Sequence, residues 1–205
     1  MAAIGRGILD LERVGGMLCI DFVNTMGWRG RALSNEWLKT PADLFLWARS
    51  CHILSQDTFD RASLMAESDA AGDLLEKAHS FREVLYCIFS AIAAKQRPCD
   101  ADITTLNNGL PAALSRLRLR PSGTGEQWEW HGDDVAIEEI LLPIVRSAME
   151  LLTSPRISRL KECANEGCAW VFLDGSKNRS RRWCDMRDCG NRAKAKRHYH
   201  RAKST

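Results

Sequence analysis

The sequence predicts a mostly α-helical domain with one small β-hairpin, an α+β arrangement, followed by a compact C-terminal module built around cysteines. Three observations support this prediction. Apolar residues recur at three- and four-residue spacing over 72–96, as on one face of a helix. Residues 116–120 and 127–131 alternate with a period of two, as strands do. Four of the eight cysteines form two equally spaced pairs near the C-terminus. We expect the domain to span 1–155 and the module 156–205.

The first apolar run, residues 17–23, is short enough to be either a strand or a buried helical turn, and its periodicity does not decide. Asp21, Asn24 and Thr25 bring polar groups into or next to this run. One interpretation is that they cap or hydrogen-bond a loop. The other is that they form, with Trp28, a pocket for a small-molecule effector.

The helices that follow are predicted from caps and periodicity. Thr40, Pro41 and Asp43 form a helix start, with a cap, a proline at the first position and an acid three residues after the cap. A short helix is expected over 59–67. The strongest helix covers 72–96, and its continuous apolar face makes it the expected centre of the core.

The next segment contains two helices on either side of a hairpin. A helix is expected from Asp100 to about residue 116, with a kink or break near Pro111. The hairpin joins 116–120 to 127–131 through a turn rich in Gly, Ser and Pro. A last helix, capped by Asp133 or Asp134, is expected to reach residue 152, with Pro143 kinking it from within.

The C-terminal module is predicted from cysteine spacing. Cys163 and Cys168 enclose four residues, fifteen residues follow, and Cys184 and Cys189 repeat the first spacing. Two disulfides would need an oxidising compartment, and iron–sulfur ligation generally uses other spacings. Four thiolates in this pattern suit a structural Zn²⁺. A segment this short buries too little apolar surface to fold alone, so metal binding would stabilise it, and chelation is expected to unfold the module while the domain stays folded.

The residues around the cysteines predict the form of this module. Residues 169–173 have the composition of a strand, Asp174-Gly175 would open a turn, and 181–183 would be the return strand. Helix formers fill 193–203, directly after the second cysteine pair. A hairpin between two cysteine pairs, followed by a helix, is a treble-clef-like zinc module.

The positive charge of the chain belongs to this module. The whole chain has a net charge of +3, but residues 161–205 carry twelve Lys or Arg and five Asp or Glu, or +7. Residues 1–160 carry seventeen and twenty-one, or −4. Such an asymmetry indicates a polyanionic partner for the module, and DNA is the first candidate.

Basic residues of the module are the candidates for phosphate contacts, with Asn191 and Arg192 nearest to a base-reading role. Asn191 could equally cap a turn beside the metal. The candidates are Lys177, Arg179, Arg181 and Arg182 in the hairpin, and Arg192, Lys194, Lys196, Arg197 and Arg201 in the helix. The alternatives are an RNA-binding protein, or an interaction module that docks on an acidic protein. Tyr199 is the only stacking aromatic in the helix, so single-strand binding is less favoured.

These motifs carry a resemblance to a known family. The stretch Cys184-x4-Cys189-Gly190-Asn191-Arg192, preceded by Cys163-x4-Cys168-x-Trp170-x-Phe172 and Arg181-Arg182-Trp183, resembles the CGNR zinc finger. The stretch from Gly15-Gly16 to Asp21-Phe22-Val23-Asn24-Thr25 resembles the start of the ABATE domain that accompanies this finger. The resemblance implies a stress-induced transcription regulator. Its N-terminal domain is then expected to sense a ligand or to form a homodimer.

Other functional classes are disfavoured by the sequence. A zinc site closed by four cysteines offers no position for a reactive water, and no nucleophile, P-loop or dinucleotide motif is present, so we expect no enzyme. No apolar run approaches the roughly 20 residues of a membrane span. Residues 1–9 lack the apolar centre of a signal peptide. We expect a cytoplasmic protein whose remaining cysteines, Cys19, Cys51, Cys87 and Cys99, are reduced core residues.

Overall fold

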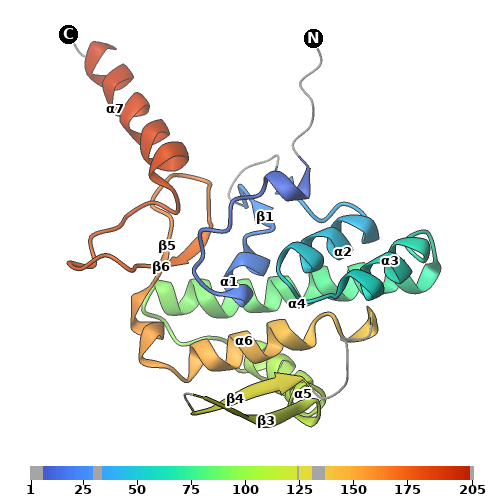
Figure 1. The fold of residues 1–205 in the computed structure, drawn as a ribbon. Coiled ribbons are helices and arrows are strands. Elements are labelled where there is room, and N and C mark those ends of the chain that lie inside the picture. The colour runs from blue at the N-terminus through green and yellow to red at the C-terminus, as the bar shows by residue number, and fades with distance from the viewer. Residues whose placement is uncertain (1–6, 30–33, 124, 131–136, 204–205) are drawn as a thin grey trace.

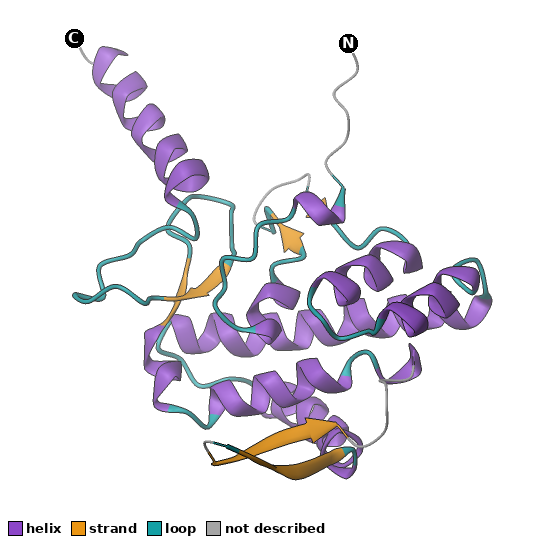
Figure 2. Cartoon of the chain, viewed as in Figure 1, coloured by secondary structure: helices purple, strands orange, loops and turns teal. Residues whose placement is uncertain are grey.

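The computed structural model describes residues 7–29, 34–123, 125–130 and 137–203. Helices make up most of this part of the chain, and its strands pair in short antiparallel two-stranded sheets (Figure 2), so the predicted α+β class is confirmed. The first half contains η1 (Ile8–Asp10), α1 (Leu18–Val23), β1 (Met26–Gly27), β2 (Asn35–Glu36), α2 (Pro41–Ser50), α3 (Gln56–Leu64), α4 (Asp69–Ala93) and α5 (Asp100–Ser115). The second half contains β3 (Leu117–Ser122), β4 (Gly125–Trp130), η2 (Ile137–Glu139), α6 (Leu142–Leu152), η3 (Pro155–Arg159), β5 (Leu160–Glu162), β6 (Val171–Leu173), η4 (Met186–Gly190) and α7 (Asn191–Lys203).

Helix α4 is the centre of the fold, as its long apolar stripe predicts. The Ser68 side chain caps its N-terminus by accepting a hydrogen bond from the backbone N–H of Ala71 at 3.2 Å. Helices α1, α2 and α5 and strand β5 pack against α4, and α6 packs on α1 and α5 (Figure 1). Leu85, Ile88 and Phe89 of α4 are completely buried. The helical body is therefore built around one long helix.

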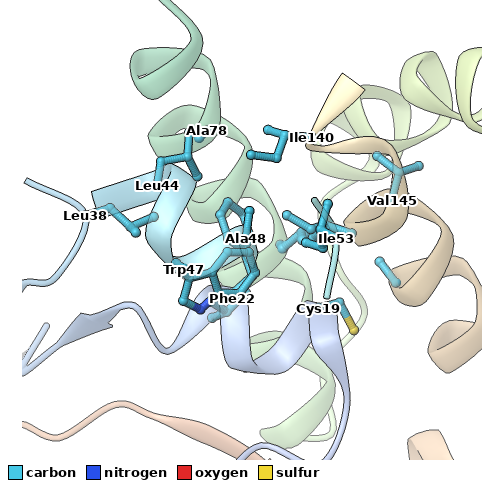
Figure 3. Close-up of a cluster of buried hydrophobic side chains, with 14 of the residues drawn as sticks. Cys19, Phe22, Leu38, Leu44, Trp47, Ala48, Ile53, Ala78, Ile140 and Val145 are labelled. Atoms are coloured by element: carbon cyan, nitrogen blue, oxygen red, sulfur yellow. The ribbon is translucent and has the colours of Figure 1, made fainter. Parts of the chain in front are cut away.

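The core joins the helices to the C-terminal strands. Phe22 of α1 and Trp47 of α2 lie with their ring centroids 5.4 Å apart, among side chains from α4 and α6 (Figure 3). The same continuous cluster of buried apolar side chains includes Leu160 of β5 and Val171 and Leu173 of β6. Strands that belong to the cysteine-containing segment thus contribute to the core of the helical body.

Several predicted elements change in detail. Residues 17–23 form a helical turn rather than a strand, and the Thr40 capping box at α2 is present as predicted. Helix α5 continues through Pro111. Pro143 does not kink a long helix but lies in the first turn of α6, where backbone N–H groups have no partner within the helix and a proline breaks no hydrogen bond. The predicted caps Asp133 and Asp134 lie outside the described residues.

The cysteines outside the two pairs were expected in the core, and this is wrong for two of them. Cys19 is buried, whereas Cys87 and Cys99 are exposed. Cys87 lies on the outer side of α4, and Cys99 precedes α5. No helix of the described residues has the length and apolarity that a membrane crossing would require.

A buried ion pair links α4 to the strands at the upper edge of the helical body. Arg82 of α4 is 2% exposed. Its Nη1 donates to Glu36 Oε1 at 2.7 Å and to Thr25 Oγ1 at 3.0 Å, and its Nη2 donates to the second Glu36 oxygen. Arg82 and Thr25 are buried and Glu36 is partly buried, so the charge of Arg82 depends on this pairing for its compensation. The pair therefore fixes β2, and with it β1, against the helical body.

Replacing Arg82 by Met should lower the free energy of unfolding by about 3 kcal/mol, because the partly buried carboxylate of Glu36 then loses its paired charge. Urea denaturation of the zinc-loaded protein measures the change. The control is Arg97→Met, which removes an exposed pair with Asp100 and should change stability by less than about 1 kcal/mol. Equal effects of the two substitutions would contradict the assigned role of Arg82.

Candidate metal centre

The first cysteine pair lies in the turn of a β-hairpin formed by β5 and β6. Leu160 pairs with Leu173 and Glu162 with Val171, and the Cys163 N–H extends the ladder to the Trp170 carbonyl at 2.8 Å. Between the strands the chain turns tightly, with Gly167 and Ala169 in the left-handed region at φ +78° and +56°. This turn brings the sulfur atoms of Cys163 and Cys168 to the same end of the hairpin.

The predicted pairing of 169–173 with 181–183 is wrong. Residues 181–183 form no strand, and the partner of β6 is β5, which precedes it in the chain. After β6 the chain is instead organised by the buried carboxylate of Asp174. It accepts hydrogen bonds from Lys161 Nζ at 2.6 Å, from the Ser176 N–H at 2.9 Å and from the Arg181 N–H at 3.1 Å. Asp174 therefore closes the loop that returns the chain to the second cysteine pair.

The second cysteine pair lies just before α7, with Cys184 preceding the short helix η4 and Cys189 within it. Asp185 caps the preceding π-helical turn η4 by accepting from the N–H groups of Arg187 and Asp188. Cys189 lies near the end of this turn, and α7 begins at Asn191, so a metal bound by Cys189 holds the first turn of the helix. A Cβ on Gly190 would overlap the Met186 sulfur, so glycine permits this close approach.

The four sulfur atoms have the spacing of a tetrahedral zinc site. All four Sγ atoms lie within 4.8 Å of one another. The distances are 3.7 Å from Cys168 to Cys184, 3.6 Å from Cys184 to Cys189 and 3.5 Å from Cys189 to Cys168. Four sulfurs at about 2.3 Å from a tetrahedral zinc lie about 3.8 Å apart. All four cysteines are buried, so the set fits a structural Zn²⁺ with no position left for a reactive water.

The sulfur atoms also depend on one another electrostatically. Hydrogen bonds from the thiols of Cys168, Cys184 and Cys189 lower the pKa of Cys163, so one thiolate forms readily in this cluster. A bound divalent cation supplies the charge with which all four can be deprotonated together. The zinc then acts as a cross-link between the β5–β6 hairpin and α7.

Hydrogen bonds tie the metal centre to the N-terminal residues. The Asn24 side chain bonds to both backbone groups of Val171, donating to the carbonyl at 2.9 Å and accepting from the N–H at 3.0 Å. The Trp28 N–H donates to the carbonyl of Cys168 at 3.1 Å. The Trp170 indole N–H donates to the Met26 carbonyl at 3.1 Å. The centre is therefore built into the helical body.

The four residues expected to form a ligand pocket do not surround one cavity. Asn24 and Thr25 are buried, and both make internal hydrogen bonds. The Asp21 carboxylate accepts from the Gly15 N–H at 2.8 Å, while its burial raises its pKa. Trp28 alone lines a cavity, which lies between the helical body and η4.

The predicted nucleic-acid residues occupy different environments. Arg181 is half-buried, and its guanidinium donates to the carbonyls of Trp183 and Cys184 and lies over the Phe172 ring. Asn191 donates to the Arg187 carbonyl at 2.8 Å. The side chain of Arg201 lies outside the described residues. The remaining candidates are exposed: Lys177, Arg179, Arg182, Arg192, Lys194, Lys196 and Arg197.

The exposed residues of α7 divide between two sides of the helix. Arg192 and Lys196, one turn apart, face the metal centre: Arg192 Nε donates to Asp188 at 2.7 Å, and Lys196 pairs with Glu166. Because an α-helix turns by about 100° per residue, Lys194 and Arg197 lie on the opposite side of α7. Neither Lys194 nor Arg197 forms an ion pair with another described residue. Helix α7 projects away from the helical body (Figure 1), so this second side faces outward.

Comparison with known proteins agrees with this architecture. A projecting helix on a four-cysteine site that fits zinc, attached to a helical body, defines a zinc-finger protein, and the two family models that match describe a transcription regulator and a zinc finger. The family model "ABATE: Putative stress-induced transcription regulator" matches residues 16–155, and the CGNR zinc finger model matches residues 159–202. The chain therefore belongs to the ABATE family, and both resemblances in the sequence are confirmed. No curated protein matches the chain.

Replacing Cys184 by Ser should abolish stoichiometric zinc binding, because three thiolates lack the geometry and charge of the site. Since β5 and β6 share the main core, the loss should also lower the thermal midpoint of the whole chain by more than about 5 °C. Metal analysis after dialysis and calorimetry measure the two effects. The control is Cys99→Ser, an exposed cysteine outside the cluster. If the helical body unfolds at an unchanged temperature, the result would instead support the sequence-based expectation that the module unfolds independently of the domain.

Asp174 gives the structure a pH-dependent element. Burial acts to raise the pKa of Asp174, but hydrogen bonds from Lys161 and Ser176 hold it well below its ordinary range. The folded state therefore binds fewer protons than the unfolded state, so the contribution of Asp174 is present above pH 4 and is lost below it.

Denaturation of the wild type and of Asp174→Asn at a series of pH values checks this. The variant should be less stable at pH 7, by a difference that stays constant down to pH 5 and shrinks below about pH 4. If the difference in the free energy of unfolding already disappears between pH 7 and pH 5, the pH dependence would come from the cysteine thiolates and not from Asp174.

Proposed function

We propose that this member of the ABATE family is a zinc-dependent transcription regulator that binds DNA through the outward side of α7 and the loop after β6. The single observation that carries the proposal is a projecting helix, anchored at its first turn to a metal ligand, whose outward basic side chains form no ion pair within the described residues. Residues 156–205 would contact DNA, and residues 1–155 would position them and respond to a signal.

Charge and geometry both support a duplex partner. Lys194 and Arg197 lie one turn apart, and Arg201 follows two turns after Lys194. Lysine and arginine on one side of a rigid helix are suited to the phosphates along a groove, where they release counterions. In the loop, Lys177, Arg179 and Arg182 are exposed and extend the positive surface.

The proposal reassigns four of the residues that the sequence suggested for DNA binding. Arg181 is omitted, because its guanidinium is used within the loop. Arg192 and Lys196 are assigned to holding α7 against Asp188 and Glu166, in place of direct phosphate contacts. The hydrogen bond of Asn191 to the Arg187 carbonyl favours a capping role over base reading. The homodimer expected from the sequence stays a prediction.

Replacing both Lys194 and Arg197 by Gln should weaken binding to duplex DNA and lower the slope of log affinity against log salt by about 0.9 for each phosphate that the helix no longer neutralises. Stability should hardly change, because both side chains are exposed. The measurement is fluorescence anisotropy with labelled genomic fragments at several salt concentrations.

The matched control replaces two exposed lysines of the helical body, Lys77 and Lys95, by Gln, and thus removes the same charge elsewhere. Chelation of zinc should abolish binding in all variants, since α7 then loses its anchored start. An unchanged salt slope in the α7 variant would contradict the proposal. Tighter binding to RNA of the same sequence, or no binding to either nucleic acid, would favour the RNA-binding or the protein-docking alternative.

A further inference from the structure

A cavity of about 700 Å³ borders the metal centre, between η1, β1 and β2 on one side and η4 and the first turn of α7 on the other. This volume is within the range of small-molecule sites. Zinc ligands contribute to its wall, because Cys168, Cys184 and Cys189 border it. A molecule bound there would contact both the helical body and the segment that carries α7.

The walls combine aromatic rings with carboxylates. The indole side chains of Trp28, Trp37 and Trp170 line the cavity. The Trp170 ring is fixed by its N–H bond to the Met26 carbonyl. Trp28 is held in a left-handed backbone conformation, at φ +56°, by the bond from its N–H to Cys168. A non-glycine residue in that conformation is uncommon, and the surrounding structure maintains it.

The cavity contains positive groups of the protein itself. The guanidinium of Arg192 lies 4.8 Å from the centre of the Trp28 ring, a cation–π distance, and Arg192 also pairs with Asp188. Arg187 pairs with Glu12 at 2.9 Å. Both arginines are exposed, 52% for Arg192 and 78% for Arg187, so these pairs are weak and easily exchanged.

The charges that line the cavity favour a positive ligand. Four carboxylates border it, those of Asp10, Glu12, Asp185 and Asp188. Among the described lining residues the positive groups are Lys39 and the two arginines. If Arg187 and Arg192 turn outward, the described residues that line the cavity keep four carboxylates and one positive group, Lys39. A bound cation would then take the place of the guanidinium groups of Arg187 and Arg192 beside these carboxylates.

We propose that this cavity binds a small organic cation, carrying a guanidinium or ammonium group, on the Trp28 ring and beside Glu12 and Asp188. The Arg192 guanidinium occupies the place of the ligand until it is displaced. Binding would release Arg192, and with it a contact between α7 and the helical body. The site goes beyond the proposed function, because it requires no DNA for binding.

The test uses the full-length, zinc-loaded protein and agmatine, which carries both a guanidinium and an ammonium group. Agmatine should change the tryptophan fluorescence in a saturable way, whereas butylurea, a neutral analogue, and butyrate, an anion, should not. Arg192→Gln removes the internal competitor and should tighten agmatine binding about two- to five-fold, the factor that corresponds to one exposed cation–π contact.

Two further variants complete the test. Glu12→Gln should weaken agmatine binding, and Trp28→Leu should abolish it. If Trp28→Leu does not fold, Arg192→Gln still decides, since its side chain is exposed and its effect is a gain. Weaker binding in Arg192→Gln, equal binding of butylurea, or no saturable signal with agmatine would overturn the proposal. Because no DNA is present, failure here is distinct from failure of the proposed DNA binding.

Discussion

Four sulfur atoms bring together the β5–β6 hairpin and the segment that leads into α7. The hairpin supplies two of them and the residues just before α7 supply the other two, and all four lie within 4.8 Å of one another. Between the pairs the chain runs through a loop organised by one buried carboxylate, Asp174. Without a metal, four thiols or thiolates at this distance are a poor cross-link. With zinc they fix where α7 begins and the direction in which it leaves the body.

The metal centre is in turn held by the helical body. Asn24 bonds to both backbone groups of Val171, and Trp28 bonds to the carbonyl of Cys168. Leu160, Val171 and Leu173 lie in the same apolar cluster as Phe22 and Trp47. The family models divide the chain near residue 155, but its buried core continues across that point. The helical body and the β5–β6 hairpin therefore share one core.

Local patterns predicted the parts of the structure that depend on local physics. The caps at Thr40 and the apolar face of α4 follow from side chains within a few residues, and the cysteine spacing identified the metal ligands. The sequence could not show which strand pairs with β6, because both candidates are short and the choice depends on the Asp174 hydrogen bonds. It also could not separate Arg181 from Arg182. Adjacent arginines look alike in a sequence, and only the packed loop turns one of them inward.

Strand β6 has partners on both of its edges. On one edge it pairs with β5, and on the other it meets the Asn24 side chain and the Gly15 carbonyl, which accepts from the Leu173 N–H at 3.0 Å. The N-terminal residues thus shield an apolar strand that would otherwise present open hydrogen-bonding groups to other molecules. Exposed strand edges of this kind promote aggregation. The zinc finger of this protein is therefore poorly suited to fusion with another protein, because a fragment starting after residue 155 would expose the unpaired edge of β6 as well as carrying the zinc site.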